Sequence, residues 1–287
     1  MAEHSFNRVA VGFGGDERSH DALALAIALA RSASATLDVI LVLKEDDPFN
    51  PAYPPVGNVQ GIIAEQAQQW IHEAEAVIPA EVTHHSHVRP ARSVAEGLVA
   101  AVEELGSDVL VTGSGIGFGR IMTHPAVTAL LHSAPVPVAL APAGYRAATT
   151  ITDVMGAVSA AHPQHQVAGT SEAWAAQLGA ELSYVTFQDG DAARGAGTPD
   201  GESGNSSDEG EAGNSSAKHI VARGKTLRHA VDTVDWPQGA ILLIGSSPLA
   251  RRRHIFLGMT AARVLSHLPI PMVLLPRDLE SSAPQAR

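Results

Sequence analysis

The sequence predicts an α/β fold made of two tandem, doubly wound domains, each built on a parallel sheet. Short aliphatic runs alternate with segments of helical periodicity along the chain, and the second half repeats the order of the first. Alternating strands and helices form βαβ units, whose right-handed crossovers place helices on both faces of a parallel sheet. The composition agrees: 45% of residues are hydrophobic but only 4% are aromatic, and buried parallel strands are typically aliphatic.

The first predicted domain, residues 1–146, contains five strands and the helices between them. Aliphatic runs predict strands at residues 9–13, 37–43, 82–88, 109–112 and 136–140. Helical spacing of apolar residues predicts helices over residues 22–30, 62–78, 93–105 and 125–132. Asp16 or Ser19 can cap the first of these helices, and Ser93 with Glu96 forms a capping box at the third.

The second predicted domain, residues 147–287, repeats this order. Strands are expected at residues 154–158, 182–187, 220–222, 241–244 and 272–275, and helices at 171–178, 226–234 and within 258–267. A strand ending in Gly-Ser occurs at Gly113-Ser114 and again at Gly245-Ser246, and a Pro-x-Pro strand entry follows each. A repeat of this length indicates duplicated domains, since solenoid units have roughly 20–50 residues.

Residues 189–216 form an acidic insert, rich in Gly and Ser, within the second domain. The insert contains seven acidic residues and one arginine, so it carries more than half of the net charge of -11. It has too few apolar residues to bury, and we therefore expect it to be disordered. The helix expected after the second strand of this domain is short or missing for the same reason.

Composition excludes several classes of function. The chain has no cysteine, which excludes disulfides and thiol catalysis and fits a reducing cytosol. We find no signal peptide and no apolar run near the ~20 residues that span a bilayer, so we expect a cytoplasmic protein that does not bind membranes. The net negative charge argues against binding of nucleic acid.

In open parallel sheets, ligands bind beyond the carboxyl ends of the strands, and glycine loops there let backbone N–H groups approach phosphates. Residues 9–30, with Val-Gly-Phe-Gly-Gly-Asp-Glu-Arg-Ser and an Ala/Leu helix, resemble the start of a universal stress protein domain. Residues 109–140, with Gly113-Ser114-Gly115 and Ala134-Pro-Val-Pro-Val, resemble its end. The resemblance covers nearly the whole chain twice and implies a Rossmann-like fold. It also implies an intramolecular pseudo-dimer in which strand 136–140 lies beside strand 272–275, covering two aliphatic edges.

Many members of that family bind ATP, with an Asp after the first strand for the adenosine. A G-x-x-G loop followed after nine residues by Gly-Ser or Gly-Thr holds the phosphates. In the first domain Gly14 stands at the Asp position, with Asp16 two residues away, and Pro125 falls in the place of the final Gly-Ser. Proline there offers no N–H to a phosphate.

The second domain matches the spacing better, with Gly245-Ser246, nine intervening residues and then Gly258. However, Pro248 and Met259 replace a glycine and a hydroxyl residue, and the first strand has no Asp. The nucleotide site is thus degenerate in both domains. The resemblance leaves ATP, accompanied by Mg²⁺ and no other metal, as the candidate ligand, with the second domain the better site. The candidate binding residues are Gly113, Ser114, Gly245, Ser246 and Gly258.

Other polar motifs can be explained either by a binding role or by their place in a solvated loop, a turn or a surface strand. Residues 251–254, Arg-Arg-Arg-His, could contact a phosphate or form a solvated loop. His85 and His87 share a strand face and could form part of a metal site, but no nearby acid or thiolate completes it, so a surface strand is favoured. His162 and His165 lie near the expected crevice, where turn chemistry explains them equally well. The glycines of residues 113–119 do not match a dinucleotide fingerprint, and the chain has no P-loop.

The function expected from the resemblance is a non-enzymatic, cytoplasmic role in stress response or regulation, with a degenerate adenine-nucleotide site. One alternative is slow ATP hydrolysis by the second domain. Another is a pure interaction module, in which the acidic insert recruits protein partners that the sequence does not identify.

Overall fold

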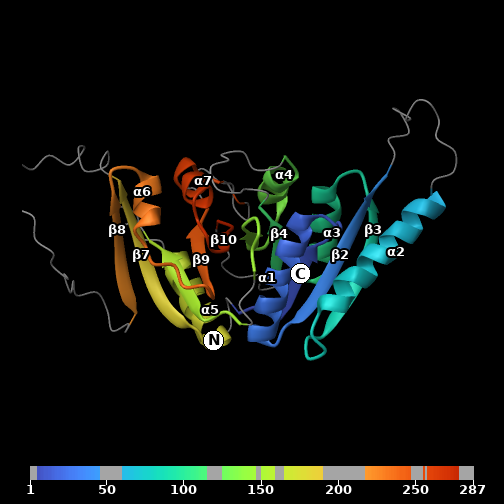
Figure 1. Ribbon diagram of the computed structural model, residues 1–287, viewed down its shortest axis with the longest axis horizontal. Helices are drawn as coiled ribbons and strands as arrows, with labels where there is room; N and C mark the ends of the chain where they lie inside the picture. The colour runs from blue at the N-terminus through green and yellow to red at the C-terminus, as the bar shows by residue number, and fades with distance from the viewer. Residues whose placement is uncertain are drawn as a thin grey trace, which may run out of the picture.

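A computed structural model describes residues 5–45, 60–114, 125–146, 150–158, 165–189, 217–246, 255 and 257–277. These residues form one ten-stranded sheet with the strand order β3-β2-β1-β4-β5-β10-β9-β6-β7-β8 (Figure 1). The strands are β1 (Arg8–Gly12), β2 (Thr36–Lys44), β3 (His84–Ala91), β4 (Val109–Gly113), β5 (Val138–Ala141), β6 (Asp153–Ala157), β7 (Glu181–Asp189), β8 (Lys218–Gly224), β9 (Ala240–Gly245) and β10 (Met272–Leu275). The helices are α1 (Glu17–Ala33), α2 (Gln60–Val77), α3 (Val94–Leu105), α4 (Pro125–Ser133), α5 (His165–Leu178), α6 (Leu227–Asp232) and α7 (Met259–Leu265).

Each half of the chain contributes five parallel strands, which confirms the predicted α/β class. In both halves the first strand pairs with the second and the fourth, so the direction of winding reverses between β1 and β4 and between β6 and β9. The halves meet where β5 pairs with β10 in an antiparallel register, with Ala139 opposite Val273. The pseudo-dimer predicted through the last strand of each half is therefore confirmed.

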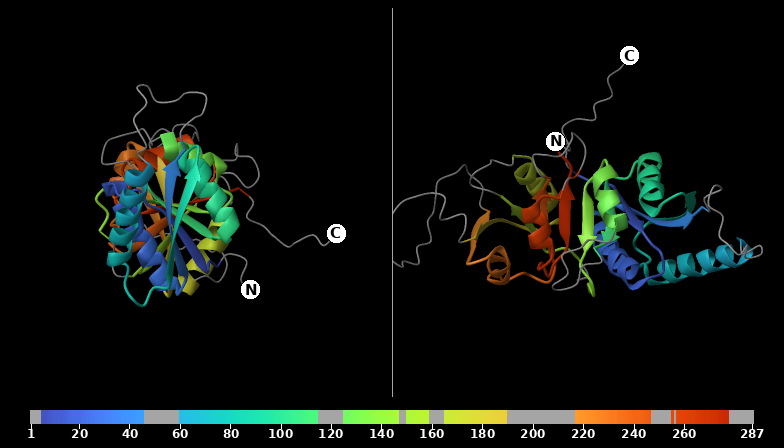
Figure 2. Two further views of the ribbon diagram at one scale, coloured as in Figure 1. Left: turned by 90° about the vertical axis from the view of Figure 1, so that its right-hand side faces the viewer. Right: turned by 90° about the horizontal axis from the view of Figure 1, so that it is seen from above.

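Helices lie on both sides of the sheet (Figure 2). One hydrophobic core packs α1, α2 and α5 against the sheet and includes residues of both halves, such as Leu25 and Ile241. Phe6 contacts Trp174 across the junction, with ring centroids 4.6 Å apart, and Gln177 exchanges two hydrogen bonds with the backbone of Phe6. The domain boundary predicted at residues 146/147 falls in the connection between β5 and β6. It stays a prediction, because the two halves share this core.

Helix ends follow the capping residues in the sequence. Asp16 caps α1 by accepting a hydrogen bond from the backbone N–H of Ser19 at 2.9 Å, and Ser93 caps α3 by accepting one from Glu96 at 3.1 Å. Helix α5 begins six residues earlier than predicted, at His165. Val167 is buried in the core, and its burial outweighs the low helical propensity of Gly169 and Thr170.

Several predictions fall on residues outside the described ranges. They concern most of the acidic insert (residues 190–216), the glycines at positions 115, 117 and 119, the Arg-Arg-Arg-His segment at 251–254, and His162.

Candidate functional site

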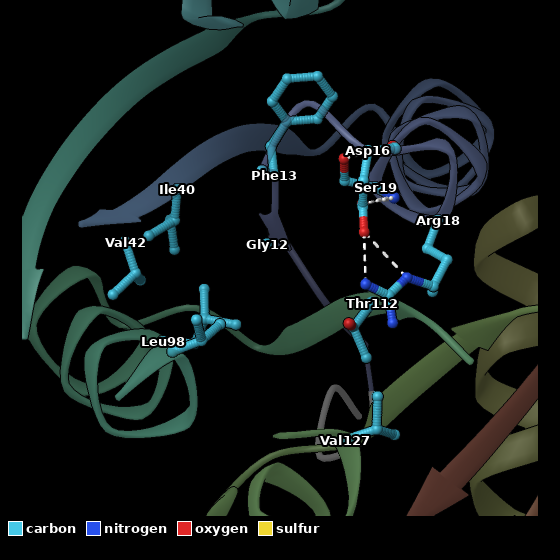
Figure 3. A pocket seen from close by; sticks show the side chains of 13 residues that line it. Gly12, Phe13, Asp16, Arg18, Ser19, Ile40, Val42, Leu98, Thr112 and Val127 are labelled. Carbon is cyan, nitrogen blue, oxygen red and sulfur yellow. Dashed lines mark hydrogen bonds and ion pairs between the residues drawn. The ribbon is translucent and has the colours of Figure 1, made fainter. Parts of the chain in front are cut away.

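A cavity of about 220 Å³ opens in the first half of the chain at the carboxyl ends of β1, β2 and β4 (Figure 3). It lies at the reversal of winding between β1 and β4, where open α/β sheets bind ligands. The residues that line it are Gly12, Phe13, Gly14, Asp16, Arg18, Ser19, Ile40, Val42, Val94, Leu98, Thr112, Gly113 and Val127.

One wall of the cavity is apolar. Ile40 and Val42 come from β2, and Leu98 comes from α3 (Figure 3). Leu98 packs so closely on Gly12 that a Cβ atom at residue 12 would lie 2.8 Å from it. Val94, the first residue of α3, is 46% exposed at the rim. Such a wall can contact a flat, uncharged ring system.

The opposite side is polar and belongs mainly to the first turn of α1. Asp16 accepts hydrogen bonds from Arg18 Nε at 2.9 Å and from Arg18 Nη2 at 2.6 Å. Burial alone would raise the pKa of Asp16, but the hydrogen bonds from Arg18 and Ser19 outweigh it and lower that pKa below 3.8. Asp16 is therefore ionised at neutral pH and holds the Arg18 guanidinium beside Thr112 (Figure 3).

Gly113, a predicted nucleotide-binding residue, does line the cavity. A glycine is required at this position for a steric reason. A Cβ atom at this position would lie 2.4 Å from the backbone oxygen of Arg18. Only glycine allows the start of α1 to come this close to β4. The neighbouring Ser114 is buried, and its backbone N–H donates to the oxygen of Ala141 at 2.8 Å, so that N–H extends the sheet.

The predicted residues of the second half lie apart from this cavity. Gly245 ends β9, and the backbone N–H of Ser246 donates to the oxygen of Leu275 at 3.0 Å, repeating the arrangement at Ser114. Gly258 is the N-cap residue of α7 and makes no side-chain capping bond. Because residues 247–254 lie outside the described ranges, a nucleotide role for Gly245, Ser246 and Gly258 stays a prediction.

Sequence reasoning did not single out Arg18, Thr112 or the apolar wall. Arg18 falls two residues after the predicted cap Asp16, which was the available signal. Its position over Gly113 depends on the packing of α1 against β4, which no local pattern reveals.

A buried carboxylate corrects the prediction that no acid lies near His85 and His87. Asp38 on β2 is fully buried, and it accepts hydrogen bonds from Arg8 Nε at 2.5 Å and from His87 Nε2 at 2.9 Å. His85 Nδ1 is 3.8 Å from the same carboxylate. The Arg8 guanidinium supplies the cation there, and among the described residues no group of three or more His, Asp or Glu side chains could hold a metal ion.

Comparison with known proteins supports the same architecture. The model of the universal stress protein family matches residues 5–142. Universal stress proteins of Mycobacterium tuberculosis and Mycobacterium bovis are each 28% identical to this chain, in alignments that cover 93% of it and 99% of the relative. Residues 5–142 therefore belong to the universal stress protein family, and these relatives extend the likeness over 93% of the chain.

Solved structures agree on the fold. A universal stress protein from Archaeoglobus fulgidus has a TM-score of 0.62 at 13% identity, covering 94% of this chain and 98% of that one. A putative universal stress protein from Pseudomonas aeruginosa has a TM-score of 0.56 at 16% identity, covering 97% and 96%. None of the helices formed by the described residues is long and apolar enough to span a bilayer.

Proposed function

We propose that this protein is a non-enzymatic regulatory member of its superfamily, and that it binds an adenine nucleotide in the cavity of its first half. The observation that carries the proposal is the division of the cavity into an apolar wall and a polar side, at the strand ends where α/β sheets bind ligands. A nucleotide has the same division, with a flat base at one end and phosphate at the other.

The proposal moves the nucleotide from the second half, which loop spacing favoured, to the first. The apolar wall offers a surface for the base, formed by Ile40, Val42 and Leu98. Arg18 offers a cation, which the spacing of the glycine loops does not predict. Gly14 stands where the family resemblance implies an aspartate, so this site would hold the adenosine without that carboxylate.

The state of Asp16 supports a regulatory rather than a catalytic role. Both of its carboxylate oxygens accept hydrogen bonds, Oδ1 from Ser19 and Oδ2 from Arg18, and its pKa is lowered. A carboxylate in this state is a poor general base, because its affinity for a proton is reduced. We therefore expect binding without appreciable hydrolysis. Residence in the cytoplasm stays a prediction.

The test is titration of the purified chain with adenosine and with ATP, followed by intrinsic tryptophan fluorescence and by melting temperature. Trp70 on α2 packs against Gly15, in the loop that carries the cavity residue Gly14, so a bound ligand should change its emission. A ligand that binds only the folded state also raises the melting temperature.

Gly14 offers a matched pair of variants, because a Cβ atom there would meet nothing within 4 Å. We expect Gly14→Asp to bind adenosine about tenfold more tightly than Gly14→Ala, because the new carboxylate can accept a charge-assisted hydrogen bond. If neither adenosine nor ATP changes the fluorescence or the melting temperature at millimolar concentration, the proposal is wrong.

A further inference from the structure

We infer that Arg18, held in place by Asp16, recognises the phosphate of a nucleoside monophosphate, so that this cavity selects one phosphate group over three. The inference rests on the proposed function and deepens it by naming the class of ligand. Arg18 would contact the ligand directly, and Asp16 would be a positioning residue.

The guanidinium of Arg18 is only partly occupied. Its Nε and Nη2 both donate to one oxygen of Asp16, and within the described part of the chain its Nη1 makes no hydrogen bond. The side chain is 44% exposed and lines the cavity next to Thr112 (Figure 3). A phosphate oxygen can therefore reach Nη1 while the pair with Asp16 stays intact.

Two contacts hold Arg18 at the cavity before any ligand arrives. The backbone of Arg18 rests on Gly113, at a separation that no larger residue would allow. Its side chain is held by the same carboxylate that caps α1 at Ser19. A group fixed in this way loses little freedom when it binds, and this preorganisation favours affinity.

Among the described lining residues, one side-chain cation is available to a phosphate. Arg18 supplies the cation and Asp16 a carboxylate, while the chain as a whole carries a net charge of -11. Helices α1 and α3 both begin at the rim, and their N-termini add partial positive charge. The backbone N–H of Ser114, a predicted nucleotide-binding residue, already donates to the oxygen of Ala141. Among the described lining residues, no second side-chain cation would neutralise two further phosphates.

The experiment is isothermal titration of the full chain with adenosine, AMP and ATP, on the wild type and on Arg18→Gln. The matched control is Arg31→Gln, because Arg31 lies in the last turn of the same helix and pairs with Glu81 instead of facing the cavity. Circular dichroism confirms that each variant is folded.

For the wild type we expect AMP to bind about 10- to 100-fold more tightly than adenosine, and ATP to bind no more tightly than AMP. Arg18→Gln should bring AMP down to the affinity of adenosine, whereas Arg31→Gln should behave as the wild type. Arg18→Lys keeps the charge but loses the planar guanidinium, so its affinity for AMP should fall between those of the wild type and Arg18→Gln.

The outcomes separate the two claims. If adenosine binds but AMP binds no better, or if Arg18→Gln leaves the preference for AMP intact, the inference is overturned while the proposed function stands. Tighter binding of ATP than of AMP would also overturn it. Failure of all three ligands to bind would refute the proposed function and this inference with it.

Discussion

Replacement of Gly113 by alanine tests how closely α1 approaches β4. The added Cβ atom would lie 2.4 Å from the backbone oxygen of Arg18, whereas ordinary van der Waals contacts of Cβ atoms begin at 3.4 Å. About 1 Å must therefore be absorbed between two packed elements. Overpacking of this kind costs about 1–3 kcal/mol. The opposing atom belongs to the backbone, which cannot swing away, so we expect Gly113→Ala to lower the free energy of unfolding by about 2–3 kcal/mol.

The matched control is Gly14→Ala, at a residue that lines the same cavity and where the new Cβ atom would meet nothing within 4 Å. There the loss of freedom in the unfolded chain should raise the stability by up to about 1 kcal/mol. Urea unfolding followed by circular dichroism and tryptophan fluorescence gives both free energies. Equal stabilities of the two variants would refute the reasoning. Gly113→Ala should also weaken AMP binding, because it displaces Arg18.

Three further predictions concern stability. Asp38→Asn should lower the free energy of unfolding by about 3 kcal/mol near neutral pH, because it leaves a buried ion pair broken. Burial raises the pKa of Asp38, but the hydrogen bonds from Arg8 and His87 outweigh this and lower the pKa below 3.8. The stabilisation is therefore complete above that pH and lost as the pH falls through the lowered value. Ser34→Gly should stabilise by about 0.5–1 kcal/mol, because Ser34 adopts a left-handed φ of 53° while the equivalent Gly179 has 62°. Tyr145→Phe should raise the free energy of unfolding by about 1 kcal/mol, because the Tyr145 hydroxyl is buried and has no hydrogen-bond partner among the described residues.

Urea midpoints measured from pH 3 to pH 8 check the first of these. If the difference in urea midpoint between the wild type and Asp38→Asn stays constant down to pH 3, the prediction for Asp38 is wrong. Ser34→Ala is the control for Ser34→Gly, and it should not stabilise, since alanine has the same restriction at positive φ. Tyr184→Phe is the control for Tyr145→Phe. Tyr184 donates to Glu172 at 3.0 Å, so its loss should destabilise slightly, and a stabilisation as large as that of Tyr145→Phe would count against our explanation.

Most of the fold was predictable because its signals are local. Aliphatic runs such as 37–43 and 109–112 predicted buried strands that are observed, and Asp16 and Ser93 marked helix starts where caps are observed. The predicted start of α5 was wrong because the burial of Val167 extends the helix through residues of low helical propensity. This burial is a tertiary effect that a local pattern does not show.

The candidate site was less predictable because its residues meet through packing. Gly113 was recognised from a family loop, yet its steric role depends on the path of α1. Asp38 was hidden inside an aliphatic run. Its partners Arg8 and His87 lie on the two neighbouring strands, so only the strand register shows that the charge is paired.

The pairing of β5 with β10 has a consequence for how the two halves can differ. In an assembly of two identical chains, every substitution appears on both sides of the junction. Here one covalent chain supplies both sides, so the junction forms at a fixed effective concentration whatever the amount of protein, and each half can change alone. Asp38 is the third residue of β2, and its counterpart, the third residue of β7, is Ser183. One half thus has a buried charge where the other half has a serine, and a binding cavity in one half can change without the same change in the other.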